Sequence, residues 1–152
     1  MTDVHSPAAR SRNMAAIRSK DTAPEILLRR ALFALGLRYR LHDPRLPGHP
    51  DLVFPKYRAA IFIHGCFWHG HNCRFFRWPA TRSAFWRKKI THNRQRDKVV
   101  HDAMSAAGWR SLIIWECAIR GRGQRALKRT SEAAARWLMH RSSRIVMIRG
   151  PK

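Results

Sequence analysis

The residues best suited to holding a metal ion are three cysteines and a histidine. Cys66, His71 and Cys73 lie within eight residues of one another, and Cys117 follows an apolar run at 109–115. Thiolate and imidazole donors in a Cys₃His set are the usual ligands of structural zinc, which takes four of them in a tetrahedron. The sequence therefore predicts a zinc site. The alternative is three unrelated thiols, buried as small apolar groups.

A second set of residues could hydrolyse a phosphodiester bond. Asp51 follows a Gly-His-Pro turn and begins an apolar run, His64 ends a stronger apolar run, and His69 lies five residues further on. A carboxylate at a strand end can hold Mg²⁺ against a phosphate. A neutral histidine nearby can take the proton of the attacking water. Acids are scarce in this chain, so Glu25, at the start of an expected helix, joins this set.

Each of these residues also has a purely structural interpretation. Glu25 could be the acidic member of a capping box, and Asp51 could be a turn acid. His64 could be a core histidine with its hydrogen bonds satisfied. His69 could be the fourth zinc ligand in place of His71. Taken singly, the residues are at least as compatible with these structural roles as with catalysis.

A third group combines aromatic and basic side chains. Nine basic residues and one acid, Asp97, lie between positions 74 and 98, interleaved with aromatic residues. Phe67 and Trp68 stand just upstream, in a loop beside glycine and histidine, where core aromatics are unexpected. Exposed aromatic rings beside basic groups stack on bases or wedge between them. We expect that role for these two rings and for Trp86, and a core position for Phe85.

These groups need a scaffold of helices and short strands. Apolar residues at helical spacing predict helices at 22–35, 81–107 and 124–140; short apolar runs predict strands at 38–42, 51–54, 59–64 and 109–115, with 145–148 as a candidate edge strand. Residues 1–20 form an arm or weak helix, and 141–152 form a basic tail. The order indicates a single α/β domain with a small mixed central sheet flanked by helices. Residues of the long helix expected to face the core are Phe85, Ile90, Val99, Val100 and Met104. Two polar residues of that helix, Lys89 and Asn93, share a face that could reach bases or phosphates.

The composition fits a protein that binds a polyanion. The chain has 152 residues, with 31 Lys+Arg against 9 Asp+Glu and a net charge of +22. Hydrophobic residues make up 45%, enough for a folded core. No apolar run reaches the roughly 20 residues that span a bilayer, and the N-terminus lacks the apolar region of a secretion signal. Charge alone fits a basic RNA-binding protein as well as an enzyme acting on nucleic acid.

Several motifs together resemble one known family. They are the run HGCFWH at 64–69, RSRNM at 10–14, LPGHPD at 46–51 and WEC at 115–117. Over about residues 3–123 the chain resembles the very short patch repair (Vsr) DNA mismatch endonucleases. The resemblance implies a restriction-endonuclease-like core. It also implies an enzyme that nicks one strand 5′ of the T in T:G mismatches left by 5-methylcytosine deamination, with a 5′-phosphate product.

The resemblance also implies a role for each candidate catalytic residue. Asp51 would bind Mg²⁺, together with the backbone carbonyl of Ile63, a position where the family commonly has threonine. His69 would be the general base. His64 and Glu25 would orient metal-bound waters.

The same resemblance implies the zinc ligands and the DNA contacts. The zinc ligands would be Cys66, His71, Cys73 and Cys117. The aromatic wedge beside the mismatch would be Phe67, Trp68 and Trp86. Met14 and Ile17 would reach the DNA from the other groove, and Lys89 and Asn93 would contact bases. The partner would be double-stranded DNA with a T:G mismatch, bound by a monomer in the cytoplasm (at the nucleoid), with mismatch-repair proteins as further partners. A zinc-stabilised DNA-binding protein without activity is the alternative.

Overall fold

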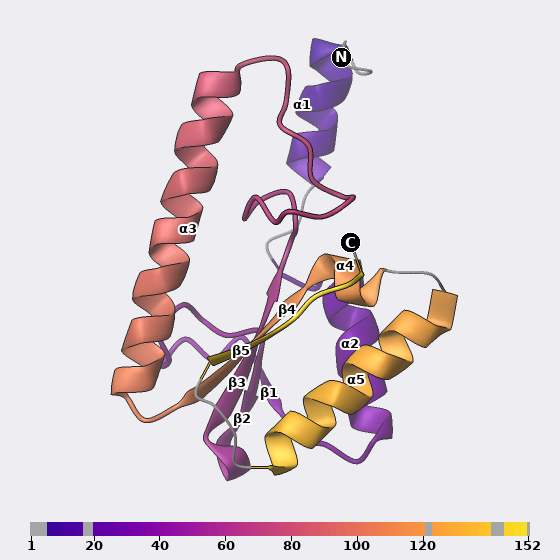
Figure 1. Cartoon of the computed structure of the whole chain (residues 1–152), viewed down its shortest axis with the longest axis vertical. Helices are drawn as coiled ribbons and strands as arrows, with labels where there is room; N and C mark the ends of the chain where they lie inside the picture. The colour runs from indigo at the N-terminus through magenta and orange to yellow at the C-terminus, as the bar shows by residue number, and fades with distance from the viewer. Residues whose placement is uncertain (1–5, 17–19, 121–122, 141–144, 152) are drawn as a thin grey trace.

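A five-stranded mixed sheet with helices on both faces organises the chain (Figure 1). The computed structural model describes residues 6–16, 20–120, 123–140 and 145–151. The helices are α1 (Pro7–Ala16), α2 (Ala23–Ala34), α3 (Ser83–Ala106), α4 (Glu116–Ile119) and α5 (Gly123–Met139), with a 3₁₀ turn at Pro55–Tyr57. The strands are β1 (Arg40–Leu41), β2 (Leu52–Phe54), β3 (Ala59–His64), β4 (Arg110–Trp115) and β5 (Ile145–Ile148). The prediction of an α/β chain with a small mixed sheet is confirmed.

The strand connections bring the chemically interesting segments to one end of the sheet. β1, β2 and β3 pair antiparallel, whereas β4 pairs parallel to β3, and β5 pairs parallel to β4. Parallel neighbours require a helical crossover, which α3 supplies between β3 and β4. His64 and Trp115 are register partners at the carboxyl ends of those two strands. The segments that follow the two strands therefore start side by side.

Each face of the sheet packs against its own helices. On one face, α2 and α5 cover the sheet through residues such as Leu28, Leu32 and Leu138. On the other, α3 packs Met104 and Val100 against alternate strand residues such as Phe62. Burying one such large apolar side chain contributes about 1.5–3 kcal/mol. The packing fixes α3 across the end of β3, which matters for the site described below.

Most predicted elements are found close to their expected limits, and the differences have physical causes. The strand at 59–64 and the edge strand at 145–148 have the predicted bounds. Within α3, the expectation that Phe85 and Val99 face the core is wrong, because their exposures are 43% and 66%. The first turns of this helix extend past the end of the sheet (Figure 1), and Phe85, its third residue, contacts Trp86 and Arg82 instead. The single-turn α4 was not predicted. Among the described residues, no helix is long and apolar enough to cross a membrane.

Candidate active site and metal centre

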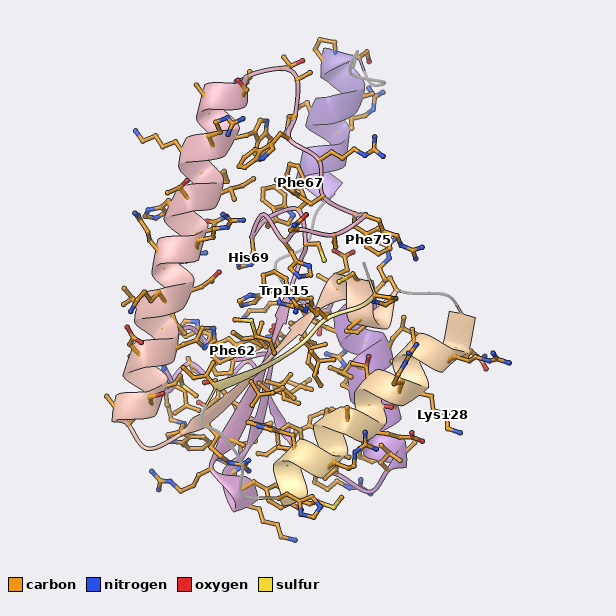
Figure 2. All side chains as sticks on the ribbon, in the orientation of Figure 1. Phe62, Phe67, His69, Phe75, Trp115 and Lys128 are labelled. Atoms are coloured by element: carbon orange, nitrogen blue, oxygen red, sulfur yellow. The ribbon has the colours of Figure 1, made fainter. Side chains whose placement is uncertain are left out.

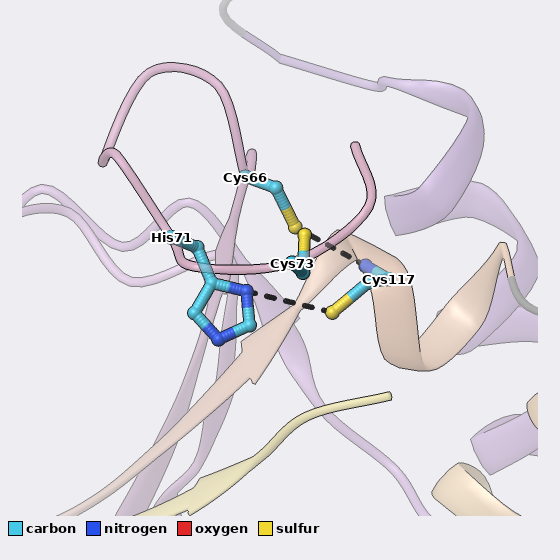
Figure 3. A group of neighbouring side chains, drawn as sticks. All are labelled: Cys66, His71, Cys73 and Cys117. Atoms are coloured by element: carbon cyan, nitrogen blue, oxygen red, sulfur yellow. Dashed lines mark hydrogen bonds between the residues drawn. The ribbon is translucent and has the colours of Figure 1, made fainter. Parts of the chain in front are cut away.

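The three cysteines and His71 come together at the ends of β3 and β4. One ligand atom from each of Cys66, His71, Cys73 and Cys117 lies within 4.8 Å of the others (Figure 3). The Cys117 backbone N–H donates to Cys66 Sγ at 3.4 Å, and Cys117 Sγ lies 3.5 Å from His71 Nδ1. α4 places Cys117, and the loop after β3 folds back to bring in the other three. The predicted grouping is confirmed, and it could hold a metal ion.

The surroundings of this cluster favour a closed, four-ligand centre. The His71 ring stacks on Trp115 with centroids 4.1 Å apart. The Gly150 backbone N–H donates to Cys117 Sγ at 3.3 Å, and a Cβ at Gly150 would lie 2.5 Å from the Cys117 carbonyl oxygen. The segment after β5 therefore closes the cluster from the side. Sequence reasoning missed this contact, which depends on the parallel pairing of β5.

The donor chemistry of the cluster fits zinc. Burial raises the pKa of the Cys66 and Cys117 thiols and lowers the pKa of His71. Buried thiols therefore stay protonated unless a cation stabilises the thiolates. All three cysteines of the chain are free, so no disulfide competes for them. Three sulfurs and one imidazole nitrogen are a donor set of the kind that structural zinc prefers.

Asp51 and Glu25 form an acidic pair at the start of β2 and of α2. The Ile63 backbone N–H donates to Asp51 Oδ2 at 2.7 Å. Burial and, more weakly, the charge of Glu25 raise the pKa of Asp51 to about 7 despite that hydrogen bond. Two buried carboxylates with so little compensating positive charge are suited to a hard divalent cation such as Mg²⁺. Asp51 is therefore a largely buried carboxylate and not an exposed acid of a turn.

Glu25 has contacts that fit both of its predicted roles, as a capping residue of α2 and as a carboxylate of the candidate active site. Glu25 Oε1 accepts a hydrogen bond from the Thr22 hydroxyl, and Oε2 accepts one from the Asp21 backbone N–H. These contacts resemble half of a capping box, although Thr22 itself makes no side-chain cap. The Glu25 side chain is only 7% exposed. The same bonds that start α2 therefore hold a buried carboxylate towards Asp51.

His69 pairs with an acid that sequence reasoning did not select. His69 Nδ1 lies 2.5 Å from Asp97 Oδ2. With its proton on Nδ1, the imidazole keeps a lone pair on Nε2 and can act as a base. Burial works against ionisation of Asp97, yet the bond with His69 and the nearby imidazoles hold its pKa below the usual value. This pairing separates the two roles left open above, because His71 and not His69 joins the cysteines.

His64 packs against this pair as a neutral ring. The His64 and His69 rings stack with centroids 4.0 Å apart and an interplanar angle of 5°. Burial, with a smaller contribution from His69, lowers the pKa of His64 to about 3. His64 Nε2 also lies 4.0 Å from Asp97 Oδ1. His64 is buried, as in the structural alternative, but its hydrogen bonds are not satisfied, because Nδ1 has no partner among the described residues, and its ring lies directly against the candidate base.

The signal for Asp97 was present in the sequence. It is the only acid among the nine basic residues between positions 74 and 98. It stands four residues after Asn93 and eight after Lys89, so all three share one face of α3. What the sequence did not show is that this face crosses the loop that carries His69.

Polar side chains of α3 hold that loop in place. Asn93 Nδ2 donates to the Trp68 carbonyl at 2.8 Å, and Arg94 donates to the carbonyls of His69 and Gly70. Gly70 has φ of +60°, and a Cβ there would lie 2.7 Å from Ile90 Cγ2. Only glycine fits this close approach to the helix. Asn93 therefore positions the loop, whereas Lys89 is exposed.

The three predicted wedge aromatics form one cluster at the tip of the loop. Ring centroids of Phe67, Trp68 and Trp86 are 5.1–5.8 Å apart, and all three side chains are half-buried. Figure 2 shows Phe67 farther from the sheet than His69 on the same loop. α1, which carries Met14, lies towards the same end of the molecule (Figure 1). The side chain of Met14 and the whole of Ile17 lie outside the described residues.

One open cleft of about 580 Å³ joins the acidic pair to the loop and α3. The lining residues that matter here are Glu25, Asp51, Ile63, Trp68, His69, Lys89 and Asn93. The structure thus brings three of the four predicted catalytic residues, Glu25, Asp51 and His69, and part of the predicted DNA-contacting set to one surface, whereas His64 is not among the residues that line this cleft. The four cysteine-cluster residues lie outside this cleft.

Comparison with known proteins decides the family. The family model described as DNA mismatch endonuclease Vsr matches residues 2–75. The chain is 47% identical over 138 residues to the DNA mismatch endonuclease Vsr of Escherichia coli (strain K12), covering 91% of this chain and 88% of that protein. The chain belongs to the Vsr family. The resemblance drawn from the sequence motifs is therefore confirmed.

Other relatives are named as type II nicking enzymes. The type II nicking enzyme V.XorIIP of Xanthomonas oryzae pv. oryzae is 46% identical over 123 residues, covering 81% of this chain and 90% of its own length. V.NmeAIP of Neisseria meningitidis, also a type II nicking enzyme, is 42% identical over 122 residues, covering 80% and 87%.

Proposed function

We propose that this chain is a Mg²⁺-dependent endonuclease that nicks one DNA strand on the 5′ side of the T in T:G mismatches, leaving a 5′-phosphate. Such mismatches arise when 5-methylcytosine deaminates. The observation that carries the proposal is the shared cleft, in which Asp51 and His69 open onto the same surface as Trp68 and Lys89. The names of the relatives, a mismatch endonuclease and nicking enzymes, support the same reaction class.

Asp51 is the proposed Mg²⁺ ligand. The Ile63 backbone carbonyl is the second protein ligand, and its contribution is independent of the side chain at that position. Mg²⁺ held there would offset the charge on the scissile phosphate and on the departing oxygen. The Ile63 N–H bond to Asp51 Oδ2 leaves Oδ1 free for that role. Glu25 and His64 orient water at the edge of the same site.

His69 is the proposed general base. Its Nε2 takes one proton from the attacking water, whose oxygen forms a bond to phosphorus as the bond from phosphorus to the 3′ oxygen breaks. Asp97 holds the proton on Nδ1 and stabilises the imidazolium that results. General-base catalysis of this kind contributes about 10²–10⁴-fold in rate. The stacked His64 ring restrains the plane of His69 without adding charge.

The aromatic cluster at the loop tip is the proposed mismatch reader. Phe67, Trp68 and Trp86 wedge between base pairs, while Met14 and Ile17 on the N-terminal arm approach from the other groove. Unstacking a step costs a few kcal/mol and least at a mismatch, so a wedge selects mismatched DNA by energy. Lys89 and Asn93 contact bases beside the wedge. The +22 charge of the chain supplies phosphate contacts that do not depend on sequence.

Zinc bound by the cysteine cluster has a structural role in this proposal. Cys66, His71 and Cys73 from the loop after β3 and Cys117 from α4 would hold it, and the bound ion would fix the start of the segment that carries His69. We assign the whole chain, 1–152, to one restriction-endonuclease-like domain with an N-terminal arm and a basic tail at 141–152. It acts as a cytoplasmic monomer on double-stranded DNA, alongside mismatch-repair proteins.

A panel of end-labelled duplexes tests this function. One duplex carries a T:G mismatch, a second carries T:A and a third C:G at the same position, each with varied flanking bases and Mg²⁺ at fixed salt. We expect a nick in one strand, immediately 5′ of the mismatched T, with a 5′-phosphate on the product. Binding without a nick would favour the non-catalytic DNA-binding protein, and stronger binding to RNA would contradict both.

A further inference from the structure

We propose that Asp21, Glu25 and His42 form a second cation site, which takes a divalent transition metal such as Mn²⁺ in preference to Mg²⁺. One ligand atom from each residue lies within 4.8 Å of the other two. The three come from different elements: Asp21 precedes α2, Glu25 lies in its first turn, and His42 follows β1. Sequence reasoning gave no role to Asp21 or His42.

The distances between the donor atoms are close to those of a coordinated metal. His42 Nε2 lies 3.5 Å from Glu25 Oε2 and 3.8 Å from Asp21 Oδ1. Neighbouring nitrogen and oxygen ligands about 2.2 Å from an octahedral ion such as Mn²⁺ stand roughly 3.1 Å apart. A contraction of roughly half an ångström would therefore close the site around an ion.

One ring nitrogen of His42, Nε2, faces the carboxylates of Asp21 and Glu25 and could act as a metal ligand. His42 Nε2 is buried and makes no hydrogen bond with any described residue. The other ring nitrogen, Nδ1, lies 3.9 Å from Asp51 Oδ1. That separation is longer than a hydrogen bond, so Asp51 acts on His42 only through its charge, which favours the tautomer with the proton on Nδ1. With its proton on Nδ1, His42 presents a lone pair at Nε2 to two acidic oxygens, an arrangement that a cation would stabilise.

The backbone holds His42 in this position. Its φ is +48°, in the left-handed region, and its N–H donates to the Asp51 carbonyl at 3.3 Å. A non-glycine residue in this conformation carries a strain cost that the surrounding contacts must offset. The side chain is thus fixed between the acidic pair and α2 before any ion binds.

The existing hydrogen bonds and ion pairs of these residues determine which ligand atoms remain available to an ion. Arg29 pairs with Asp21 Oδ1 at 2.7 Å, and Glu25 already accepts bonds from the Thr22 hydroxyl and the Asp21 N–H. Glu25 and His42 are therefore fixed ligands, whereas Asp21, 51% exposed, would use Oδ1 for an ion and for Arg29 together, since a carboxylate oxygen has two lone pairs. One nitrogen and two carboxylates suit a transition ion, because Mg²⁺ prefers oxygen ligands and water.

Nitrogen coupling to bound Mn²⁺ tests the proposal without DNA or activity. The full chain, with zinc supplied first, receives one equivalent of Mn²⁺, and pulsed EPR detects ¹⁴N from a coordinated imidazole. We expect this coupling in the native chain and in Asp51→Asn, and its loss in His42→Gln. The matched control is His69→Gln, which removes a histidine from the His64–His69–Asp97 group, the neighbouring cluster that could also hold an ion. Coupling should persist in that control.

Two results would overturn the proposal. Coupling that survives in His42→Gln but is lost in His69→Gln would place the ion at the other group. Absence of coupling in the native chain would mean that His42 does not coordinate an ion. Glu25→Gln gives a second readout: we expect Mn²⁺ affinity to fall at least tenfold, and unchanged affinity counts against the site. Thermal melting confirms that each variant is folded.

Discussion

The cysteine cluster and the acidic cleft lie at the same end of one sheet, yet they are built in opposite ways. The cysteine cluster is closed by Trp115, α4 and the backbone of Gly150. The acidic cleft leaves Asp51, Glu25 and His69 on an open surface. Closed four-ligand sites are typical of structural metals, and open positions are typical of catalytic ones. We therefore expect the cysteine cluster to hold the fold and the acidic cleft to perform the proposed reaction.

The two regions also differ in how the free-energy cost of ionising their buried groups would be offset. In the cysteine cluster, burial raises the thiol pKa values, and zinc would remove the cost of ionisation permanently. In the acidic cleft, burial raises the pKa of Asp51 to about 7, and no described cationic side chain neutralises it. The free-energy cost of ionising Asp51 therefore persists until a cation binds. The predictions below test each half of this contrast.

Loss of a cysteine ligand should have the largest effect. Cys117→Ser removes a ligand that links α4 to the loop after β3, and structural zinc contributes on the order of 10 kcal/mol in small zinc domains. We expect the variant to lose zinc and to unfold tens of degrees earlier in a thermal melt. Asp51→Asn, as the matched control, should retain one zinc. Native melting in the Cys117→Ser chain would contradict a structural centre.

Asp97→Asn should reduce catalysis while leaving the fold intact. The amide cannot hold the Nδ1 proton of His69 as a carboxylate does, so the base loses its orientation and its stabilising charge. We expect the single-turnover nicking rate to fall about 10²–10⁴-fold. Asp102→Asn is the control, because Asp102 lies on the same helix, is exposed and forms an ion pair with Lys98. Equal rates in the two variants would remove Asp97 from the mechanism.

The raised pKa of Asp51 predicts how stability varies with pH. Folded Asp51 titrates near 7, against an ordinary value of 3.8, so between these values the folded chain binds one more proton than the unfolded chain. Its stability therefore falls as pH rises through this window. Without Mg²⁺, Asp51→Asn should gain stability over the native chain as pH rises, by up to about 4 kcal/mol at pH 8.

Urea unfolding of both chains between pH 5 and pH 8 measures this gain. Saturating Mg²⁺ should reduce it, because the cation stabilises the ionised carboxylate of the native chain only. If Asp51→Asn raises the free energy of unfolding by the same amount at pH 5 and pH 8, the pKa of Asp51 is not raised by burial.

The smallest effect is expected at the loop tip. Trp68→Ala removes one ring of the aromatic cluster, worth about 1–3 kcal/mol of stacking on a base. Nicking of a T:G duplex should fall roughly tenfold or more, while affinity for a matched duplex stays close to native. Phe85→Ala, an exposed ring next to Trp86, is the control. A parallel loss on matched and mismatched duplexes would contradict the wedge.

Local patterns were sufficient to predict residues whose significance is visible in a short stretch of chain. The HGCFWH run identified Cys66 and His69, and an apolar run gave β3 its bounds. Asp97 and His42 depend instead on contacts 28 and 9 positions away along the chain, with His69 and Asp51. Such contacts follow from how α3 crosses the loop and how β1 pairs with β2. No local periodicity encodes either arrangement.

The most direct test of the account is the nicking rate of Asp51→Asn on one T:G duplex. At saturating Mg²⁺ and pH 8, under single-turnover conditions, we expect a loss of at least about 10³-fold, on the scale of other charge-stabilising groups. DNA affinity, measured at the same salt concentration, should change by less than about threefold, because the wedge and the basic residues are intact. A native nicking rate in this variant would contradict the assignment of the acidic cleft as the catalytic site.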